Sequence, residues 1–120
     1  MKNKLKLILW GKNLESPIDY DNLEFDKYKL KYDYGYELFL YKNNEIIKKI
    51  YWFEDGNLSS DWNYKNGKFD GKQHGWYENG NKKYEDNYKN GERDGKQYVW
   101  HNDGNKYGEW NFKNGKKYEK

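Results

Sequence analysis

From residue 50 onwards, hydrophobic and polar positions recur along the chain with a period of 24 residues. Trp52, Trp76 and Trp100 share one phase of this period, and Tyr64, Tyr88 and Phe112 share another. Between the rings lie short runs of Lys, Asn, Asp and Glu. A fixed period of this size is typical of repeat proteins, in which each unit buries its surface against its neighbours.

Each period contains two turn signals, an Asn-Gly or Asp-Gly dipeptide between strand-like runs. These dipeptides are the strongest local signal for a β-hairpin, because both residues tolerate a positive φ angle. We therefore predict a β-meander and assign structural turn roles to six glycines: Gly56, Gly67, Gly80, Gly91, Gly104 and Gly115.

The first part of the chain carries a weaker version of this pattern. Lys2–Trp10 alternates in the manner of a strand, and Ser16-Pro17-Ile18-Asp19 has the capping residues of a short helix. Residues 25–32 and 36–41 resemble strands, and a degenerate repeat begins at Tyr41. We predict one all-β domain, an antiparallel meander of hairpin repeats of about 24 residues with one short N-terminal helix. Residues 1–40 form N-terminal strands and a cap, and residues 41–120 form the hairpin repeats.

The turn geometry at Asn79-Gly80 decides which side chains share a face of the sheet. A two-residue turn places Trp76 opposite Lys83, whereas a three-residue loop places Trp76 opposite Lys82 and His74 opposite Tyr84. We predict the three-residue loop, because that register gathers the apolar residues on one face. The predicted face consists of Ile50, Trp52, Leu58, Trp62, Tyr64, Trp76, Tyr84, Tyr88, Tyr98, Trp100, Trp110 and Phe112. Asn57, Ser59, Asp61 and Asn63 begin the polar face, where Tyr51, Phe53 and Tyr77 are exceptions.

Composition supports an ordered chain but names no ligand. The hydrophobic fraction is only 34%, yet 21% of the residues are aromatic, and each buried ring removes about 150–250 Å² from water. The net charge of +3 comes from interleaved basic and acidic residues, which disfavours a nucleic-acid or membrane partner. The chain has no cysteine. Its N-terminal apolar run is too short for a membrane span or a signal peptide, so we expect a cytoplasmic protein.

The repeats resemble the MORN-repeat variant of YwqK-type bacterial antitoxins. The matching residues are Gly75-Trp76-Tyr77-Glu78-Asn79-Gly80-Asn81-Lys82-Lys83, followed by Tyr88-Lys89-Asn90-Gly91 and Asp94-Gly95-Lys96. The resemblance covers residues 50–117 clearly and 41–49 weakly, and residues 1–40 have no counterpart. It implies a β-hairpin array that binds other macromolecules, and an antitoxin or immunity role in bacteria. It brings no catalytic residue.

No catalytic pattern stands out either. His74 and His101 occupy different phases of the repeat, and none of Ser16, Ser59 and Ser60 has the context of a nucleophile. We therefore expect a non-enzyme without metal or cofactor, and we take the aromatic stripe as the candidate surface for a partner. Its members are Trp52, Trp62, Tyr64, Trp76, Tyr84, Tyr88, Trp100 and Trp110.

Three functions fit such a stripe. The first is a protein-binding inhibitor that blocks a partner enzyme such as a toxin or a defence nuclease. In this case the partner is a protein, and no direct contact with nucleic acid is expected. The second is a module that binds carbohydrate, choline or lipid headgroups. The third is a protein that binds single-stranded nucleic acid, which the acidic residues beside most lysines disfavour.

Overall fold

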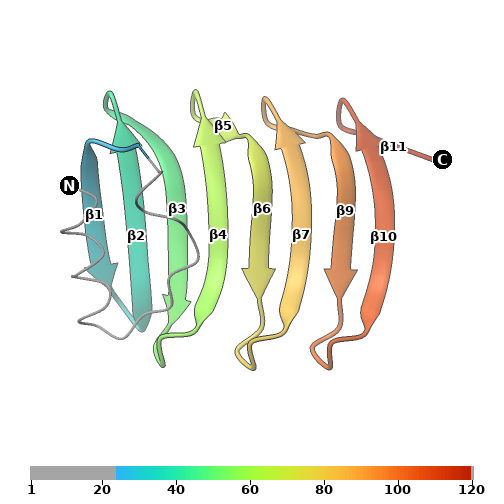
Figure 1. Cartoon of the computed structure of the whole chain (residues 1–120), viewed down its shortest axis with the longest axis horizontal. Coiled ribbons are helices and arrows are strands. Elements are labelled where there is room, and N and C mark those ends of the chain that lie inside the picture. The colour runs from blue at the N-terminus through green and yellow to red at the C-terminus, as the bar shows by residue number, and fades with distance from the viewer. Residues whose placement is uncertain (1–23, 120) are drawn as a thin grey trace.

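The computed structural model describes residues 24–119, which form one antiparallel β-sheet without a helix. Figure 1 shows the long strands side by side in chain order. The strands are β1 Lys27–Tyr32, β2 Gly35–Lys42, β3 Glu45–Phe53, β4 Leu58–Lys65, β5 Lys68–Phe69, β6 Gly71–Trp76, β7 Lys82–Lys89, β8 Glu92–Arg93, β9 Gly95–Trp100, β10 Lys106–Lys113 and β11 Lys116–Tyr118. The prediction of an all-β meander is confirmed.

Pairing follows the chain from β1 to β11. The two-residue strands β5 and β8 lie off this path and extend the hairpins of β4 and β7, respectively. The sheet is continuous across residue 40, which lies within β2. The strand predicted at Lys2–Trp10 and the helix predicted at Ser16–Asp19 lie outside the described residues.

Two kinds of turn alternate along the chain, one kind at each end of the strands. All six predicted turn glycines have positive φ. The turns at Asn66, Asn90 and Asn114 have two residues, and both of these have positive φ, as in Asn90 (52°) and Gly91 (85°). That is the backbone of the type I′ hairpin turn.

At the other end of the strands, the loops have three residues. The Gly80 amide donates to the Tyr77 carbonyl, and the Tyr77 amide donates to the Asn81 carbonyl, each at 2.9 Å. Gly80 has a φ of 91°, which suits glycine because it has no Cβ to clash with the neighbouring backbone. Trp76 lies opposite Lys82, so the three-residue loop is confirmed.

The prediction of a single apolar face is wrong, because a bulge follows each three-residue loop. After the pair Trp76–Lys82, the next pair is Gly75–Tyr84, and His74 faces Glu85 rather than Tyr84. Lys83 is thus an extra residue in the returning strand, and Ser59 and Tyr107 are extra at the same point of the other units. An extra residue reverses which positions of a strand point to which side.

Cross-strand partners therefore define two faces, since residues directly opposite one another point to the same side of a sheet. Face 1 carries the row Leu38, Ile50, Asp61, His74, Glu85, Tyr98 and Glu109. Face 2 carries the row Glu37, Tyr51, Ser60, Gly75, Tyr84, Val99 and Gly108.

The apolar core lies on face 1 over β2–β4. Leu38, Leu40 and Ile50 are fully buried there and Trp52 is 2% exposed. A buried ion pair lies beside this core, with Lys48 Nζ 2.7 Å from Asp61 Oδ1 and donating to Asn63 Oδ1 at 2.9 Å. Because a buried charge is costly unless it is paired, Lys48 and Asp61 depend on one another.

Candidate binding surface

Face 2 carries a layer of half-buried rings across most of the sheet, which we call the aromatic surface. Its members are Phe39, Tyr51, Trp62, Tyr64, Phe69, Tyr84, Tyr88, Trp110 and Phe112. Alternation along each strand places them on this side, and the bulges keep them in phase from one unit to the next.

Ring contacts link β2 to β7 along this surface. Phe39 lies 6.4 Å from Tyr51, and Tyr51 lies 5.2 Å from Trp62, between ring centroids. Phe69 lies 5.9 Å from Trp62 and 5.2 Å from Tyr88. All four contacts are edge-on, the arrangement favoured by the ring quadrupoles.

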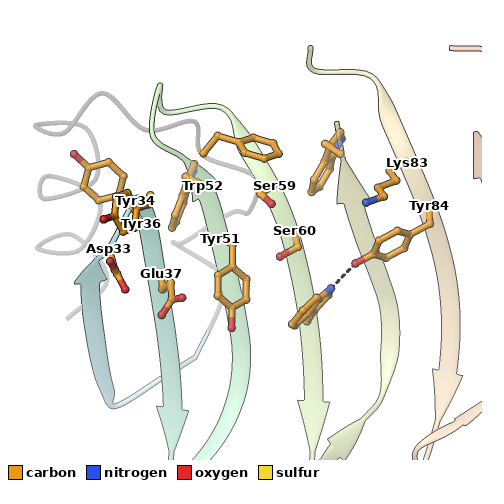
Figure 2. A pocket seen from close by; sticks show the side chains of 14 residues that line it. Asp33, Tyr34, Tyr36, Glu37, Tyr51, Trp52, Ser59, Ser60, Lys83 and Tyr84 are labelled. Atoms are coloured by element: carbon orange, nitrogen blue, oxygen red, sulfur yellow. Dashed lines mark hydrogen bonds between the residues drawn. The ribbon is translucent and has the colours of Figure 1, made fainter. Parts of the chain in front are cut away.

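A hollow of about 450 Å³ opens among these rings. Figure 2 shows Tyr51, Tyr84 and Lys83 along it, with a dashed line for the hydrogen bond that Tyr84 accepts. The Trp62 indole Nε1 donates to the Tyr84 hydroxyl at 2.7 Å. Asp33 and Glu37 line the hollow near β2, and Lys83 lines it near β7, so its two ends carry opposite charge.

Glycines on face 2 let two rings lie flat on the sheet. A Cβ on Gly75 would overlap the Tyr84 ring, and a Cβ on Gly108 would overlap the Trp110 ring. Neither glycine has a positive φ. Space for the ring is therefore the physical reason for glycine at both positions.

Cations alternate with rings near the strand ends that are joined by the two-residue turns. Lys49 lies over Tyr64, with its Nζ 5.1 Å from the ring centroid. Arg93 lies between Tyr88 and Phe112, at 5.9 and 5.3 Å from their centroids. Each such contact is worth about 0.5–1 kcal/mol at an exposed site.

A carboxylate interrupts the aromatic surface at Asp86, which is 7% exposed. Burial raises the pKa of Asp86, although the Arg93 charge and a hydrogen bond from Gln97 oppose that rise. Arg93 Nη2 lies 3.8 Å from Asp86 Oδ2. A second hollow, of about 370 Å³, lies at this point and is lined by Tyr77, Lys83, Tyr84, Asp86, Arg93, Gln97 and Val99.

The phenols of Tyr51, Tyr64 and Tyr84 remain protonated near neutral pH. Burial raises the pKa of Tyr51, Tyr64 and Tyr84 above the usual value of 10.0. The surface therefore offers neutral hydroxyl groups that can donate or accept hydrogen bonds.

Five of the eight residues predicted to bind a partner lie in the aromatic surface: Trp62, Tyr64, Tyr84, Tyr88 and Trp110. The other three lie on face 1. Trp52 is buried in the core, while Trp76 and Trp100 stack on His74 and Tyr98 at 5.7 and 5.8 Å.

Four rings of the aromatic surface are not among the eight predicted binding residues. Phe39, Tyr51 and Phe69 also lie outside the predicted apolar face, whereas Phe112 belongs to it. Without the bulge beside it, the alternation of the chain places Tyr51 on the predicted polar face. Phe69 has Arg93 and Lys117 as its counterparts in the next units, so its place in the repeat carries no aromatic pattern.

The polar groups of face 1 are paired with one another rather than gathered around a common point. His74 Nδ1 lies 3.5 Å from Glu85 Oε1, and Glu109 accepts from Lys96 and Lys106 at 2.9 and 3.0 Å. Within residues 24–119 no group of three or more His, Asp or Glu side chains is placed to hold a metal ion. The same residues include no helix long and apolar enough to cross a membrane.

Comparison with known protein families finds no matching family, and no curated protein matches the chain. Among solved structures, the chain is similar to one chain of the "Glycosylation Associate Protein (Gap123) complex from Streptococcus agalactiae", with 19% identity and a TM-score of 0.46. The similarity covers 86% of this chain and 20% of that chain. A likeness at this level carries no argument about function.

Proposed function

We propose that the protein is a non-catalytic inhibitor that binds a partner enzyme through the aromatic surface of face 2. The observation that supports this proposal is the presence of nine half-buried rings on one side of a single sheet, five of them joined by edge-on ring contacts. Tyr and Trp are enriched at the centres of protein interfaces, where a ring buries a large area at low entropic cost.

The chemistry around the rings also favours a protein partner. The aromatic surface and its two hollows carry the cations Lys49, Lys83 and Arg93 as well as the carboxylates Asp33, Glu37 and Asp86, so the surface has mixed charge. A phosphate backbone would meet carboxylates there as often as cations, and its binding depends on an excess of cations. A protein surface can match mixed charge group by group.

The kind of partner follows from the repeats. Their resemblance to YwqK-type antitoxins favours an enzyme such as a toxin or a defence nuclease, held inactive in a stable complex. Inhibition by surface contact needs no catalytic group on this chain.

Capture of the partner by the full chain from nuclease-treated host lysate tests the proposal, with two variants taken from the repeat itself. Tyr51→Val places on face 2 the residue that occupies the equivalent position 99, and Tyr98→His places on face 1 the residue of position 74. We expect one stoichiometric enzyme whose activity falls when it is bound. Tyr51→Val should weaken binding at least about tenfold, the loss of one hot-spot ring, while Tyr98→His should bind as the parent does.

Two results would contradict this proposal. One is a captured protein whose activity is unchanged at saturation. The other is retention of sugars or headgroups, and of no protein, by the parent chain. Loss of binding in Tyr98→His together with full binding in Tyr51→Val would transfer the site to face 1.

A further inference from the structure

The second hollow of face 2 lies where the repeat otherwise places an indole. Trp62, Asp86 and Trp110 occupy the same position of three successive units. All three side chains point to face 2, as their strand partners Lys49, Gln73 and Gln97 do. The middle unit thus replaces a large ring by a small carboxylate, and the hollow of about 370 Å³ opens there.

The floor of this hollow has unused hydrogen-bonding capacity. Asp86 is 7% exposed, and its Oδ1 atom accepts no hydrogen bond from the described residues. The Nε atom of Arg93 is likewise buried and donates none within residues 24–119. A buried carboxylate oxygen without a donor destabilises the folded chain, and a ligand that supplies a donor would recover that loss.

The flanking units show how an indole is held at this position. Trp62 donates its Nε1 hydrogen to the Tyr84 hydroxyl at 2.7 Å. Trp110 lies under a cation, with Lys117 Nζ 5.4 Å from its ring. The middle unit offers a hydrogen-bond acceptor and a cation but no indole. Asp86 is the acceptor, and Arg93 is a cation that already lies over two rings.

We infer that this hollow receives a Trp or Tyr side chain from the partner protein, with its N–H or O–H donating to Asp86 and its ring beneath Arg93. The inference rests on the proposed function and names the anchor by which the partner is held. Lys83 and Arg93 beside the hollow disfavour a basic anchor, and Asp86 disfavours an acidic one. An aliphatic anchor would leave the Oδ1 atom of Asp86 without a donor.

A donor-bearing probe can test the hollow directly. N-acetyl-tryptophanamide is titrated into the full chain and followed by amide NMR shifts, with N-acetyl-phenylalaninamide as the matched probe that lacks a ring donor. We expect saturable shifts at Gln97 and Val99, larger for the tryptophan probe. Asp86→Asn should reduce the difference between the probes, because a neutral amide oxygen is a weaker acceptor than a carboxylate.

Asp86→Trp fills the hollow with the residue of the flanking units. Because Trp110 beside Lys117 already pairs an indole with a cation at the equivalent positions, we expect this variant to fold and to lose the saturable shifts. Equal shifts in Asp86→Trp, or equal shifts for the two probes in the parent chain, would overturn the inference. If Asp86→Trp does not fold, the comparison of the probes in Asp86→Asn decides.

The same variant distinguishes failure of this inference from failure of the proposed function. A partner enzyme that binds Asp86→Trp as tightly as the parent chain contradicts the anchor and leaves the inhibitor function in place. Probe binding that Asp86→Trp abolishes, in a chain that captures no enzyme, supports the hollow as an aromatic site and contradicts the inhibitor function. A loss of partner affinity of about 100-fold or more in Asp86→Trp, the effect of a central hot spot, supports both.

Discussion

At the scale of the residue, His74 on face 1 should make the stability of the sheet depend on pH. Burial lowers the pKa of His74, and Glu85 and Asp61 oppose this effect while Lys72 and Lys82 assist it. The folded state therefore binds the imidazole proton less readily than the unfolded chain does. The contribution of neutral His74 is present above its ordinary pKa of 6.5 and is lost as the pH falls below that value.

We expect the free energy of unfolding of the parent chain to decrease as the pH falls below 6.5, the ordinary pKa of a histidine side chain. His74→Gln should show a smaller decrease, measured by urea unfolding at several pH values. His101→Gln is the matched control for the substitution itself, because His101 is exposed. The same slope in His74→Gln and the parent chain would show that another group carries the effect.

Gly75 allows a second test at this scale, because its φ is not positive and its role is confined to packing. Gly75→Ala should destabilise the protein by about 1–3 kcal/mol, the usual cost of overpacking, since the new methyl group overlaps the Tyr84 ring. Chemical unfolding measures this cost.

A double-mutant cycle isolates the contact from other effects of alanine. In a Tyr84→Ala background the ring is absent, so the same change at Gly75 should cost much less. An equal cost in both backgrounds would mean that Gly75 is needed for another reason.

At the scale of elements, the three Asn-Gly turns of the two-residue type differ in how each one packs on the preceding unit. The Gly91 amide donates to the Phe69 carbonyl and the Gly115 amide to the Arg93 carbonyl, each at 2.9 Å. Within the described residues Gly67 has no such backbone acceptor, and nothing lies within 4 Å of a Cβ built on it. The first of these turns is therefore the most open.

This difference predicts that Asn66 deamidates first. In that reaction the glycine nitrogen attacks the asparagine Cγ, ammonia leaves, and water opens the resulting succinimide. A hydrogen bond from the glycine amide to a carbonyl opposes the loss of its proton, so Asn90 and Asn114 should react more slowly. Peptide mapping by mass spectrometry after incubation in mildly alkaline buffer measures the three rates.

Asn79 provides the control for this prediction, because its side chain is held from both ends. Its Oδ1 accepts from the Asn81 amide at 2.9 Å, and its Nδ2 donates to the Asn102 carbonyl at 2.7 Å. Asn79 should therefore remain intact although glycine follows it. Deamidation at Asn90 or Asn114 as fast as at Asn66 would contradict the role of the glycine amide.

Turns could be predicted from the sequence, whereas the division of rings between the faces could not. Asn-Gly and Asp-Gly require an unusual backbone, so each dipeptide marks its own turn. The bulge residues Ser59, Lys83 and Tyr107 share no chemical feature, and each shifts the alternation by one position. Rings also occupy adjacent positions, as in Tyr51 and Trp52, so either phase of the alternation gathers rings on one face.

The candidate site was predictable only in part, for the same physical reason. A ring can be recognised from composition, but its face depends on how many residues separate it from a bulge. The hollow at Asp86 follows from comparing units at one position, and this comparison has meaning only once the faces are assigned.

At the scale of the whole molecule, burial on face 1 declines from the first units to the last. Ile50 and Trp52 are buried in the first unit. The residues at the same two positions of the next units are half-buried, namely His74 and Trp76, and then Tyr98 and Trp100. Because each unit of a repeat array is stabilised only by its neighbours, local stability should follow this decline. The last strand, β11, adds only a short exposed edge with Lys116 and Lys117, which resists pairing with another chain.

We therefore expect amide hydrogen exchange to be slowest in β2–β4 and to become faster toward β10 and β11, as measured residue by residue by NMR. Leu38→Ala should cost about 2–5 kcal/mol and lower protection throughout the sheet, because it weakens the unit on which the others depend. Trp100→Ala should lower protection in β9–β11 and leave β2–β4 unchanged. Uniform protection in the parent chain, or a loss in β2–β4 caused by Trp100→Ala, would mean that the sheet unfolds as one cooperative unit despite its graded burial.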